Sequence, residues 1–234
     1  MIGVSFDGTG YGTDGTIWGG EILLSDLDGF TRVGSVMPFL QVGGDASSKE
    51  GWRIAVSLIY GMTGDRKKAA EITEKLELCT KQEANVQFTM ADRKINAVIS
   101  TSAGRLFDGV SAMLGIRRKS TFEGEASMAL EFAAEEYRET MLEKSKQQIQ
   151  ETEKYGYDKE DTDTLNRNEN LSETEEIKRM DDKLISAGDR LLLNTESLIK
   201  EILNRQLNGK RKYFSLYFRR PAKSHSSGYN LGSA

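Results

Sequence analysis

The sequence of 234 residues contains one cysteine, Cys79, one histidine, His225, and only 2 prolines. One cysteine excludes an internal disulfide, so we expect a reducing, cytoplasmic setting. One histidine and one cysteine cannot form a histidine-rich metal site or a cysteine zinc cluster within this chain. Cys79 has no basic neighbour at catalytic spacing, and His225 lies in a polar stretch. We therefore expect neither to take part in chemistry.

Long apolar runs and an excess of positive charge are also missing. No stretch of about 18 apolar residues exists, which excludes a transmembrane helix of ordinary length. The formal net charge of −4 and the isoelectric point near 5.3 give no electrostatic footprint for nucleic-acid binding. Residues 1–6 lack the basic start of a signal peptide. We expect neither a membrane nor a nucleic acid as a partner.

Glycine is unevenly distributed, because 18 of the 23 glycines fall in residues 1–124. This asymmetry excludes a collagen-like or uniformly low-complexity chain. Hydrophobic residues at 38% and charged residues at 29% are typical of a soluble globule with a polar tail or insert. The distribution indicates a turn-rich first half joined to a helical, charged second half.

The first forty residues indicate a meander of antiparallel strands. Residues 1–6 predict a buried strand that ends at Asp7, and residues 7–15 predict a glycine-rich hairpin loop. Residues 16–24 and 30–36 predict the next two strands. The expected fold class is therefore α/β, in the α+β sense, with an N-terminal β-meander followed by helices.

Apolar residues at helical spacing follow from residue 46 onward. Asp45 is expected to cap the first helix, Gly61 and Gly64 to end it, and Gly115 to close a later one. The predicted helices cover residues 46–62, 65–79, 81–90, 105–114, 123–150 and 194–207. We divide the chain into a first segment 1–142, a charged insert or linker 143–182, a helical continuation 183–218 and a disordered tail 219–234.

The first stretch that could carry chemistry is Asp7-Gly8-Thr9-Gly10, directly after the first strand. Backbone N–H groups in such a loop can bind phosphate oxygens, and the carboxylate can hold a metal ion that bridges them. A hairpin turn with a capping aspartate is the alternative. The stretch is not a Walker A loop, because Gly-Lys-Ser/Thr is missing. It is not a dinucleotide fingerprint either, because a strand follows it.

Two further stretches lead into helices. Residues 100–108 form a small-residue turn before a helix, where free N–H groups and the helix dipole favour an anion or a ribose hydroxyl. Asp108 lies one turn past Gly104 on the same face. An ordinary Ser/Thr N-cap is the alternative for this stretch. Residues 122–126 form a third tight turn into a helix, for which a capping loop is the alternative.

Together these stretches resemble one family. Residues 4–21, VSFDGTGYGTDGTIWGGE, are similar to the signature stretch of the HypF-type carbamoyltransferases of NiFe-hydrogenase maturation. The likeness covers about residues 1–135, and a weaker likeness covers residues 183–218. Further matches, in chain order, lie at residues 30–34, 38–39, 43–46, 52–53, 95–96, 101–108 and 122–124.

The resemblance implies part of an actin-like ATPase fold of the ASKHA type, shared with the TsaD-like tRNA carbamoyltransferases. It implies an enzyme that makes carbamoyl-adenylate from carbamoyl phosphate and ATP. The enzyme would then pass the carbamoyl group to the C-terminal cysteine of a HypE-like protein acceptor. The family also implies a divalent metal, zinc or iron, whose ligands are mostly missing from this sequence.

The resemblance also implies where a nucleotide would bind. The loop after the first strand would face the phosphates, and Asp7 would also reach the metal. Gly104 and Asp108 would approach the ribose, and Gly124 would pack near the adenosine. No catalytic residue is implied. The residues placed at the nucleotide or carbamoyl-adenylate in this way are Asp7, Gly8, Thr9, Gly10, Gly104, Asp108 and Gly124.

The sequence departs from the family pattern in ways that predict a fragment. The paired-histidine motif expected before the first strand is absent, as are a later Gly-Gly-Val segment and a metal-binding aspartate. Residues 219–225 resemble a shifted or aberrant end, and residues 143–182 an insertion. We expect this chain alone to be inactive and to bind nucleotide weakly or not at all.

Three alternatives remain open from the sequence. A related enzyme could carbamoylate a tRNA or a small molecule instead of a protein thiol. The chain could also be a non-catalytic binding module, in which the acidic helices of residues 124–210 dock a partner. The third alternative is a truncated product without function.

Overall fold

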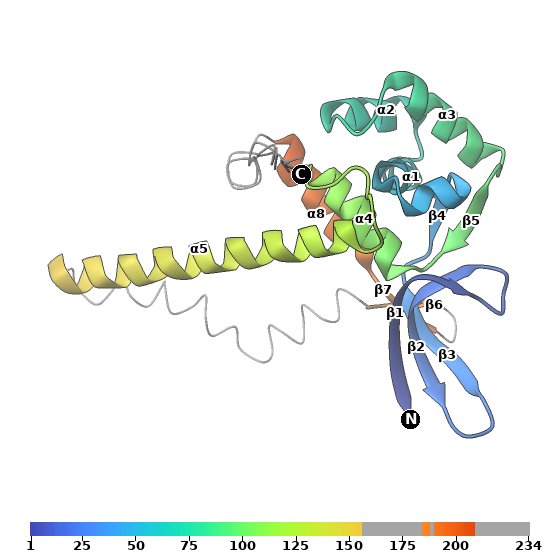
Figure 1. The fold of residues 1–234 in the computed structure, drawn as a ribbon, viewed down its shortest axis with the longest axis horizontal. Coiled ribbons are helices and arrows are strands. Elements are labelled where there is room, and N and C mark those ends of the chain that lie inside the picture. The colour runs from blue at the N-terminus through green and yellow to red at the C-terminus, as the bar shows by residue number, and fades with distance from the viewer. Residues whose placement is uncertain (156–183, 188–189, 209–234) are drawn as a thin grey trace, which may run out of the picture.

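The computed structural model describes residues 1–155, 184–187 and 190–208. They form a mixed sheet with helices packed beside it, which confirms the expected α/β class (Figure 1). The elements in chain order are β1 (Ile2–Tyr11), β2 (Ile17–Ser25), β3 (Phe30–Val36), β4 (Phe39–Val42), the 3₁₀ helix η1 (Gly44–Ser48), α1 (Gly51–Thr63), α2 (Arg66–Lys75), α3 (Lys81–Asp92), β5 (Ala97–Ser100), α4 (Ala103–Met113), α5 (Glu125–Tyr155), β6 (Leu184–Ala187), β7 (Arg190–Leu193) and α8 (Thr195–Leu207).

The sheet is built on the predicted meander. Strands β1, β2 and β3 pair antiparallel in chain order. The full order is β4-β5-β2-β3-β7-β6, and β1 pairs with β2 outside this path. Strand β5 runs parallel to β2, with Ser100 beside Ile17. The end of β5, where the chain turns into α4, therefore lies next to the start of β2.

Strand β1 differs from its prediction in length and in burial. It continues past Asp7 to Tyr11, and Ile2, Val4 and Phe6 are 72%, 63% and 61% exposed. Among the described residues β1 pairs only with β2, so these alternate side chains face away from the described core. The hairpin turn moves to residues 12–16, where the Gly12 N–H donates to the Thr16 carbonyl at 2.9 Å.

Helix α1 lies at the centre of the core. Trp52, Ile54 and Ile59 are each at most 2% exposed. The helix crosses α4 at short distance, because a Cβ on Gly51 would lie 2.6 Å from the carbonyl oxygen of Asp108. Glycine at this position lets the two backbones touch, and the contact fixes where α4 begins relative to the sheet.

The ends of α1 correct two predictions. Asp45 lies inside η1 and does not cap α1, whose N-cap is Glu50. The backbone first makes this 3₁₀ turn from Gly43, which has a φ of 117°. Gly64 ends α1 with a φ of 61°, as predicted, whereas Gly61 lies within the helix. One glycine costs a helix about 1 kcal/mol, less than burial of the apolar face of α1 contributes.

Helices α2 and α3 begin at side-chain caps. The Asp65 carboxylate accepts the N–H groups of Lys67 and Lys68, and Thr80 forms a capping box with Glu83. Cys79 lies in the turn between these helices, not in a helix as predicted. Burial raises the pKa of its thiol to about 11. A thiol with this pKa is protonated at neutral pH and is a weak nucleophile.

Residues 184–187 and 190–193 correct the prediction of a helical continuation, because they form the antiparallel strands β6 and β7. Strand β7 pairs parallel with β3, and Leu191 lies opposite Gly34. A short apolar run is compatible with either a strand or a helix. Here the strand forms because β7 can pair with the edge of β3. The predicted helix after Asn194 is confirmed as α8, and Ile199 and Leu203 bury its apolar face.

Helix α5 continues without a break through the predicted boundary at residue 142 and extends away from the other elements (Figure 1). Ala126 and Ala133, in its first turns, are buried. No helix in the described ranges is long and apolar enough to cross a bilayer. The rest of the predicted insert and the predicted tail, including His225, lie outside the described residues. The proposed segment boundaries therefore remain predictions.

Candidate functional site

The candidate site starts with a bulge in β1. Phe6 pairs with Gly20 and Gly10 pairs with Trp18, so residues 7–9 stand opposite the single residue Gly19. A bulge lets a strand turn side chains and peptide groups out of the ladder, and such features are common next to active sites. The stretch predicted as a loop is therefore an irregular part of a strand that faces α4.

The N-terminus of α4 packs directly against this bulge. Ser102 caps the helix by accepting the Arg105 N–H at 3.0 Å. The same hydroxyl lies 2.9 Å from the carbonyl oxygen of Asp7 and 2.8 Å from that of Gly8. A Cβ on Gly104 would lie 2.9 Å from the Cα of Gly8. Small residues on both elements thus bring the bulge against the positive end of the helix dipole.

Arg105 extends from this helix end across the bulge. Its guanidinium is almost buried, with the residue 7% exposed, and Nη1 donates to the Ser48 carbonyl at 2.9 Å. A Cβ on Gly8 would meet Nη2 at 3.2 Å. The Nε atom is buried and has no hydrogen-bond partner in the described part of the chain. Arg105 therefore places its guanidinium beside the backbone of Gly8, and the Nε–H of this group has no hydrogen-bond acceptor among the described residues.

Asp108 lies one turn further along α4 and is 4% exposed. Its Oδ2 atom is 3.0 Å from Nη2 of Arg105, close enough for an ion pair. Burial raises the pKa of the Asp108 carboxyl to about 6, and the positive charge of Arg105 partly opposes this rise. Near neutral pH the carboxylate is charged and can hold the guanidinium in place.

The raised pKa makes the contribution of Asp108 to stability depend on pH. The folded pKa of about 6 exceeds the ordinary value of 3.8, so the folded chain holds this proton more tightly than the unfolded chain. The stabilisation is full below about pH 4 and is lost as the pH rises through about 6. The Asp108→Asn variant lacks this titration and serves as the reference. The unfolding free energy of the chain, relative to that of this variant, should fall by roughly 2 kcal/mol over this range. Urea denaturation across the range measures it, and a constant difference contradicts it.

The bulge, Arg105 of α4, residues 48–49 and residues 121–123 line a cavity of about 350 Å³. Its wall contains two cationic side chains, Lys49 and Arg105, two anionic ones, Asp7 and Glu123, and one aromatic ring, Phe122. The remaining lining residues are Gly8, Thr9, Ser48 and Thr121. A cavity with mixed charges, exposed peptide groups and an aromatic ring suits a polar, charged organic ligand.

The structure brings together only some of the residues that the resemblance implied. Asp7, Gly8 and Thr9 line the cavity, and Gly104 contacts Gly8 from behind. Three others are not on its wall. Gly10 packs against the Trp18 carbonyl, Asp108 is buried beside Arg105, and Gly124 lies in the turn before α5 with a φ of 77°.

Sequence reasoning did not assign Lys49, Arg105 or residues 121–123 to the site. Arg105 had one usable signal, because it follows Gly104 in the first turn of a predicted helix, where a side chain can reach an anion. Lys49 had no such signal in the sequence, because its position at the cavity depends on the path of the chain through η1. The third stretch, residues 122–126, predicts a turn into a helix, and the resemblance implies only Gly124 from it as a site residue.

The described residues do not fit a zinc or iron site. No group of three or more histidine, cysteine, aspartate or glutamate side chains gathers in the described ranges. Zinc and iron sites need several such ligands. The Asp7 carboxylate instead accepts the N–H of Gly8 at 2.6 Å.

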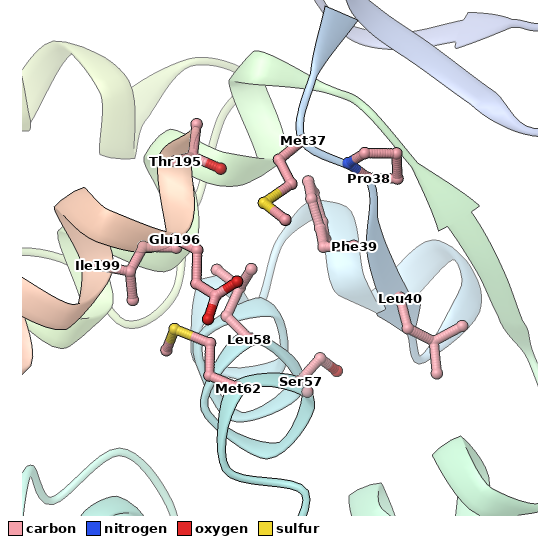
Figure 2. Close-up of a pocket in the computed structure, with 11 residues that line it drawn as sticks. Met37, Pro38, Phe39, Leu40, Ser57, Leu58, Met62, Thr195, Glu196 and Ile199 are labelled. Carbon is pink, nitrogen blue, oxygen red and sulfur yellow. The ribbon is translucent and has the colours of Figure 1, made fainter. Parts of the chain in front are cut away.

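A second cavity of about 280 Å³ lies between α1, α8 and the segment that joins β3 to β4 (Figure 2). Met37, Phe39, Leu58 and Met62 give it a largely apolar wall. Glu196, at the start of α8, adds one carboxylate. Ser57 and Thr195 add hydroxyls, but no cationic side chain is among its described lining residues, so we place the candidate site in the first cavity.

Comparison with known families identifies the chain. It matches the family described as "Carbamoyltransferase, Kae1-like Domain, second subdomain" over residues 3–212. The chain belongs to this family. The resemblance seen in the first 135 residues is thereby confirmed, and the match extends across most of the chain.

Named relatives point the same way. The probable carbamoyltransferase HypF of Methanocaldococcus jannaschii is 37% identical over 135 residues, which are 58% of this chain and 17% of that protein. Carbamoyltransferase HypF of Rhodobacter capsulatus is 41% identical over 132 residues, 56% of this chain and 17% of the relative. A HypF homologue of Cupriavidus necator is 36% identical over 141 residues, 58% of this chain and 34% of the relative. The chain thus spans between 17% and 34% of these relatives.

A solved structure shares the fold. It is described as full-length HypF in the phosphate- and nucleotide-bound form, and it is 26% identical to this chain with a TM-score of 0.60. The match covers 93% of this chain and 23% of that one. The described elements therefore have the fold of the matching part of HypF.

Proposed function

We propose that this chain forms one wall of the nucleotide site of a HypF-type carbamoyltransferase. In the proposed reaction, carbamoyl phosphate, ATP and water give carbamoyl-adenylate, pyrophosphate and inorganic phosphate. The carbamoyl group then moves to the C-terminal cysteine of a HypE-like protein, and AMP leaves. The observation that carries the proposal is the cavity between the bulge at residues 7–9 and the start of α4, with Arg105 in its wall. The nucleotide-bound relative supports it.

The cavity offers three kinds of group to a phosphate. The start of α4 supplies a positive dipole, the bulge supplies peptide N–H groups, and Lys49 and Arg105 supply charge. In the transfer step, the acceptor thiolate would attack the carbamoyl carbon and the bond to the adenylate oxygen would break. Negative charge then grows on the departing AMP phosphate. A fixed guanidinium such as that of Arg105 stabilises this charge without reorganisation.

Asp7 must move when an anion binds at Gly8. Its carboxylate now accepts the Gly8 N–H at 2.6 Å, so a phosphate oxygen would have to displace it. The side chain is exposed and can turn toward solvent. The ribose role of Asp108 and the adenosine role of Gly124 remain predictions. For Asp108, the ion pair with Arg105 favours a second role, in which it orients the guanidinium.

The proposal is tested in the HypF of Rhodobacter capsulatus with its aligned segment replaced by the aligned residues of this chain, here termed the chimera. We expect release of AMP and pyrophosphate from ATP that depends on carbamoyl phosphate, together with carbamoylation of a HypE-like acceptor. The unaltered relative is the positive control. A folded chimera without this turnover contradicts the proposal, and transfer to tRNA instead of the protein favours the alternative enzyme.

Arg105→Gln should lower the rate of carbamoyl transfer by the chimera about 100-fold, as loss of one fixed donor to a developing anion does elsewhere. Arg66→Gln is the matched control, because Arg66 lies on α2 with its side chain 46% exposed and outside the cavity wall. Acceptor carbamoylation is followed by mass spectrometry, and thermal melting checks that each variant is folded. If Arg105→Gln lowered the transfer rate by less than about threefold, Arg105 would not stabilise the departing phosphate.

A further inference from the structure

A buried carboxylate binds the backbone of Gly19, the residue that stands opposite the bulge. Glu21, on β2, is only 2% exposed. Its Oε2 atom accepts the N–H groups of Gly19 at 2.6 Å and Gly20 at 2.7 Å. Its Oε1 atom accepts from Arg32 Nη2 at 2.9 Å and from the Thr101 hydroxyl. One side chain thus connects β2, β3 and the turn that leads into α4.

Two of the donor residues, Gly19 and Gly20, lie against the backbone of the bulge and of the turn into α4. A Cβ on Gly19 would lie 2.5 Å from the Asp7 carbonyl oxygen and 3.1 Å from the Cα of Ser102. A Cβ on Gly20 would lie 2.5 Å from the carbonyl oxygen of Thr101. Gly19 also stands opposite the bulge and has no register partner on β1. Glu21 satisfies the N–H group that the bulge leaves out of the ladder.

Arg32 is itself held on several sides, so it is a fixed partner for Glu21. Its guanidinium lies 4.3 Å from the centre of the Trp18 ring, and Nη1 is 3.2 Å from Asp14 Oδ2. Nη2 also donates to the Thr101 hydroxyl at 3.0 Å. A buried carboxylate with four donors is costly to disturb, and its geometry is set by all of its partners together.

We propose that Glu21 is a positioning residue for the site. It holds Gly19, Gly20 and Thr101 in one layer, and this layer sets how close residues 7–9 come to the start of α4. The inference rests on the proposed function, because it concerns the same cavity. Glu21 does not line the cavity, so it acts through the backbone of the bulge and not on a ligand.

The first experiment measures the bulge in the full chain without any nucleotide. Glu21→Gln keeps the shape of the side chain but removes its charge, and Thr101→Val removes one donor with less disturbance. In each variant the amide signals of Gly8 and Thr9 should shift in ¹H–¹⁵N spectra, and their hydrogen exchange should rise about tenfold. Exchange of the α1 amides of residues 55–59 should change less than about twofold. Asp28→Asn, in the exposed β2–β3 turn, is the control. It should change neither the signals and exchange of Gly8 and Thr9 nor the exchange of the α1 amides.

The second experiment uses the chimera. Glu21→Gln should raise the KM for ATP about tenfold and change kcat less than about threefold, because the phosphate wall is displaced while Arg105 remains. Faster exchange throughout the chain, or unchanged Gly8 and Thr9 signals in folded variants, overturns the positioning role. An unchanged KM for ATP in an active chimera also overturns it. If the unsubstituted chimera has no turnover, the proposed function fails, and the spectra still decide whether Glu21 positions the bulge.

Discussion

Gly104→Ala should lower carbamoyl transfer by the chimera about 100-fold while leaving the unfolding free energy of the chain within about 1 kcal/mol. The new Cβ would lie 2.9 Å from the Cα of Gly8 and 3.2 Å from the Asp7 carbonyl oxygen, so the bulge must move away from α4. Alanine favours a helix over glycine by about 1 kcal/mol, which offsets part of the strain. A shift of about 1 Å at a site can reduce a rate about 100-fold.

Gly61→Ala is the matched control for this variant. Gly61 also lies in a helix, but an added Cβ there would meet nothing within 4 Å. This control should keep full activity and gain about 0.5–1 kcal/mol of stability. Transfer rates and urea denaturation measured on both variants separate the effects. If Gly104→Ala keeps its activity, contact between the bulge and α4 does not shape the site.

Trp52→Ala should reduce the unfolding free energy of the chain by about 3–5 kcal/mol. The indole is 2% exposed in the core around α1, and the Arg53 guanidinium lies 4.5 Å from the ring centre. Removing it deletes a large buried apolar surface and leaves a cavity that close-packed neighbours fill only in part. Since small domains have only about 5–15 kcal/mol of stability, this loss is a large share of the total.

Val86→Ala is the comparison for the tryptophan, because Val86 is 51% exposed on α3. It should change the unfolding free energy by less than about 0.5 kcal/mol. Equilibrium urea denaturation, monitored by circular dichroism, measures both variants. Similar small losses for Trp52→Ala and Val86→Ala would show that the described core is not the stabilising centre of this chain.

Local signals in the sequence were sufficient for the regular parts of the fold. The alternation in residues 16–36 predicted two strands, and Gly64, Gly115 and Asn194 marked helix ends that the structure has. These features depend on a few neighbouring residues. Backbone preferences and side-chain caps are local, so a single sequence reveals them.

Long-range contacts decided what the sequence did not reveal. Residues 7–9 had a loop composition, but pairing of Gly10 with Trp18 returns the chain to the strand and creates a bulge. The short apolar runs at residues 184–187 and 190–193 form strands, because β7 pairs with the edge of β3 and β6 pairs with β7. The first pairing depends on where the turn between β1 and β2 falls, and the second joins segments far apart in sequence. Periodicity cannot distinguish a strand from a helix over four residues.

The candidate site was only partly predictable for the same reason. Asp7, Gly8 and Thr9 stood out as a small-residue cluster and do line the cavity. The cations that make the cavity suitable for an anion, Lys49 and Arg105, come from segments far away in sequence. The position of Lys49 depends on the course of η1 and that of Arg105 on how α4 packs against β1, which the sequence does not specify.

The most direct test of the account is a crystal structure of the chimera with a non-hydrolysable ATP analogue. The account predicts phosphate oxygens within hydrogen-bonding distance of the Gly8 or Thr9 N–H and of the Arg105 guanidinium, with the Asp7 carboxylate turned away from Gly8. Phosphates bound elsewhere, with the Asp7–Gly8 hydrogen bond intact and Arg105 still paired only with Asp108 and Ser48, would contradict it.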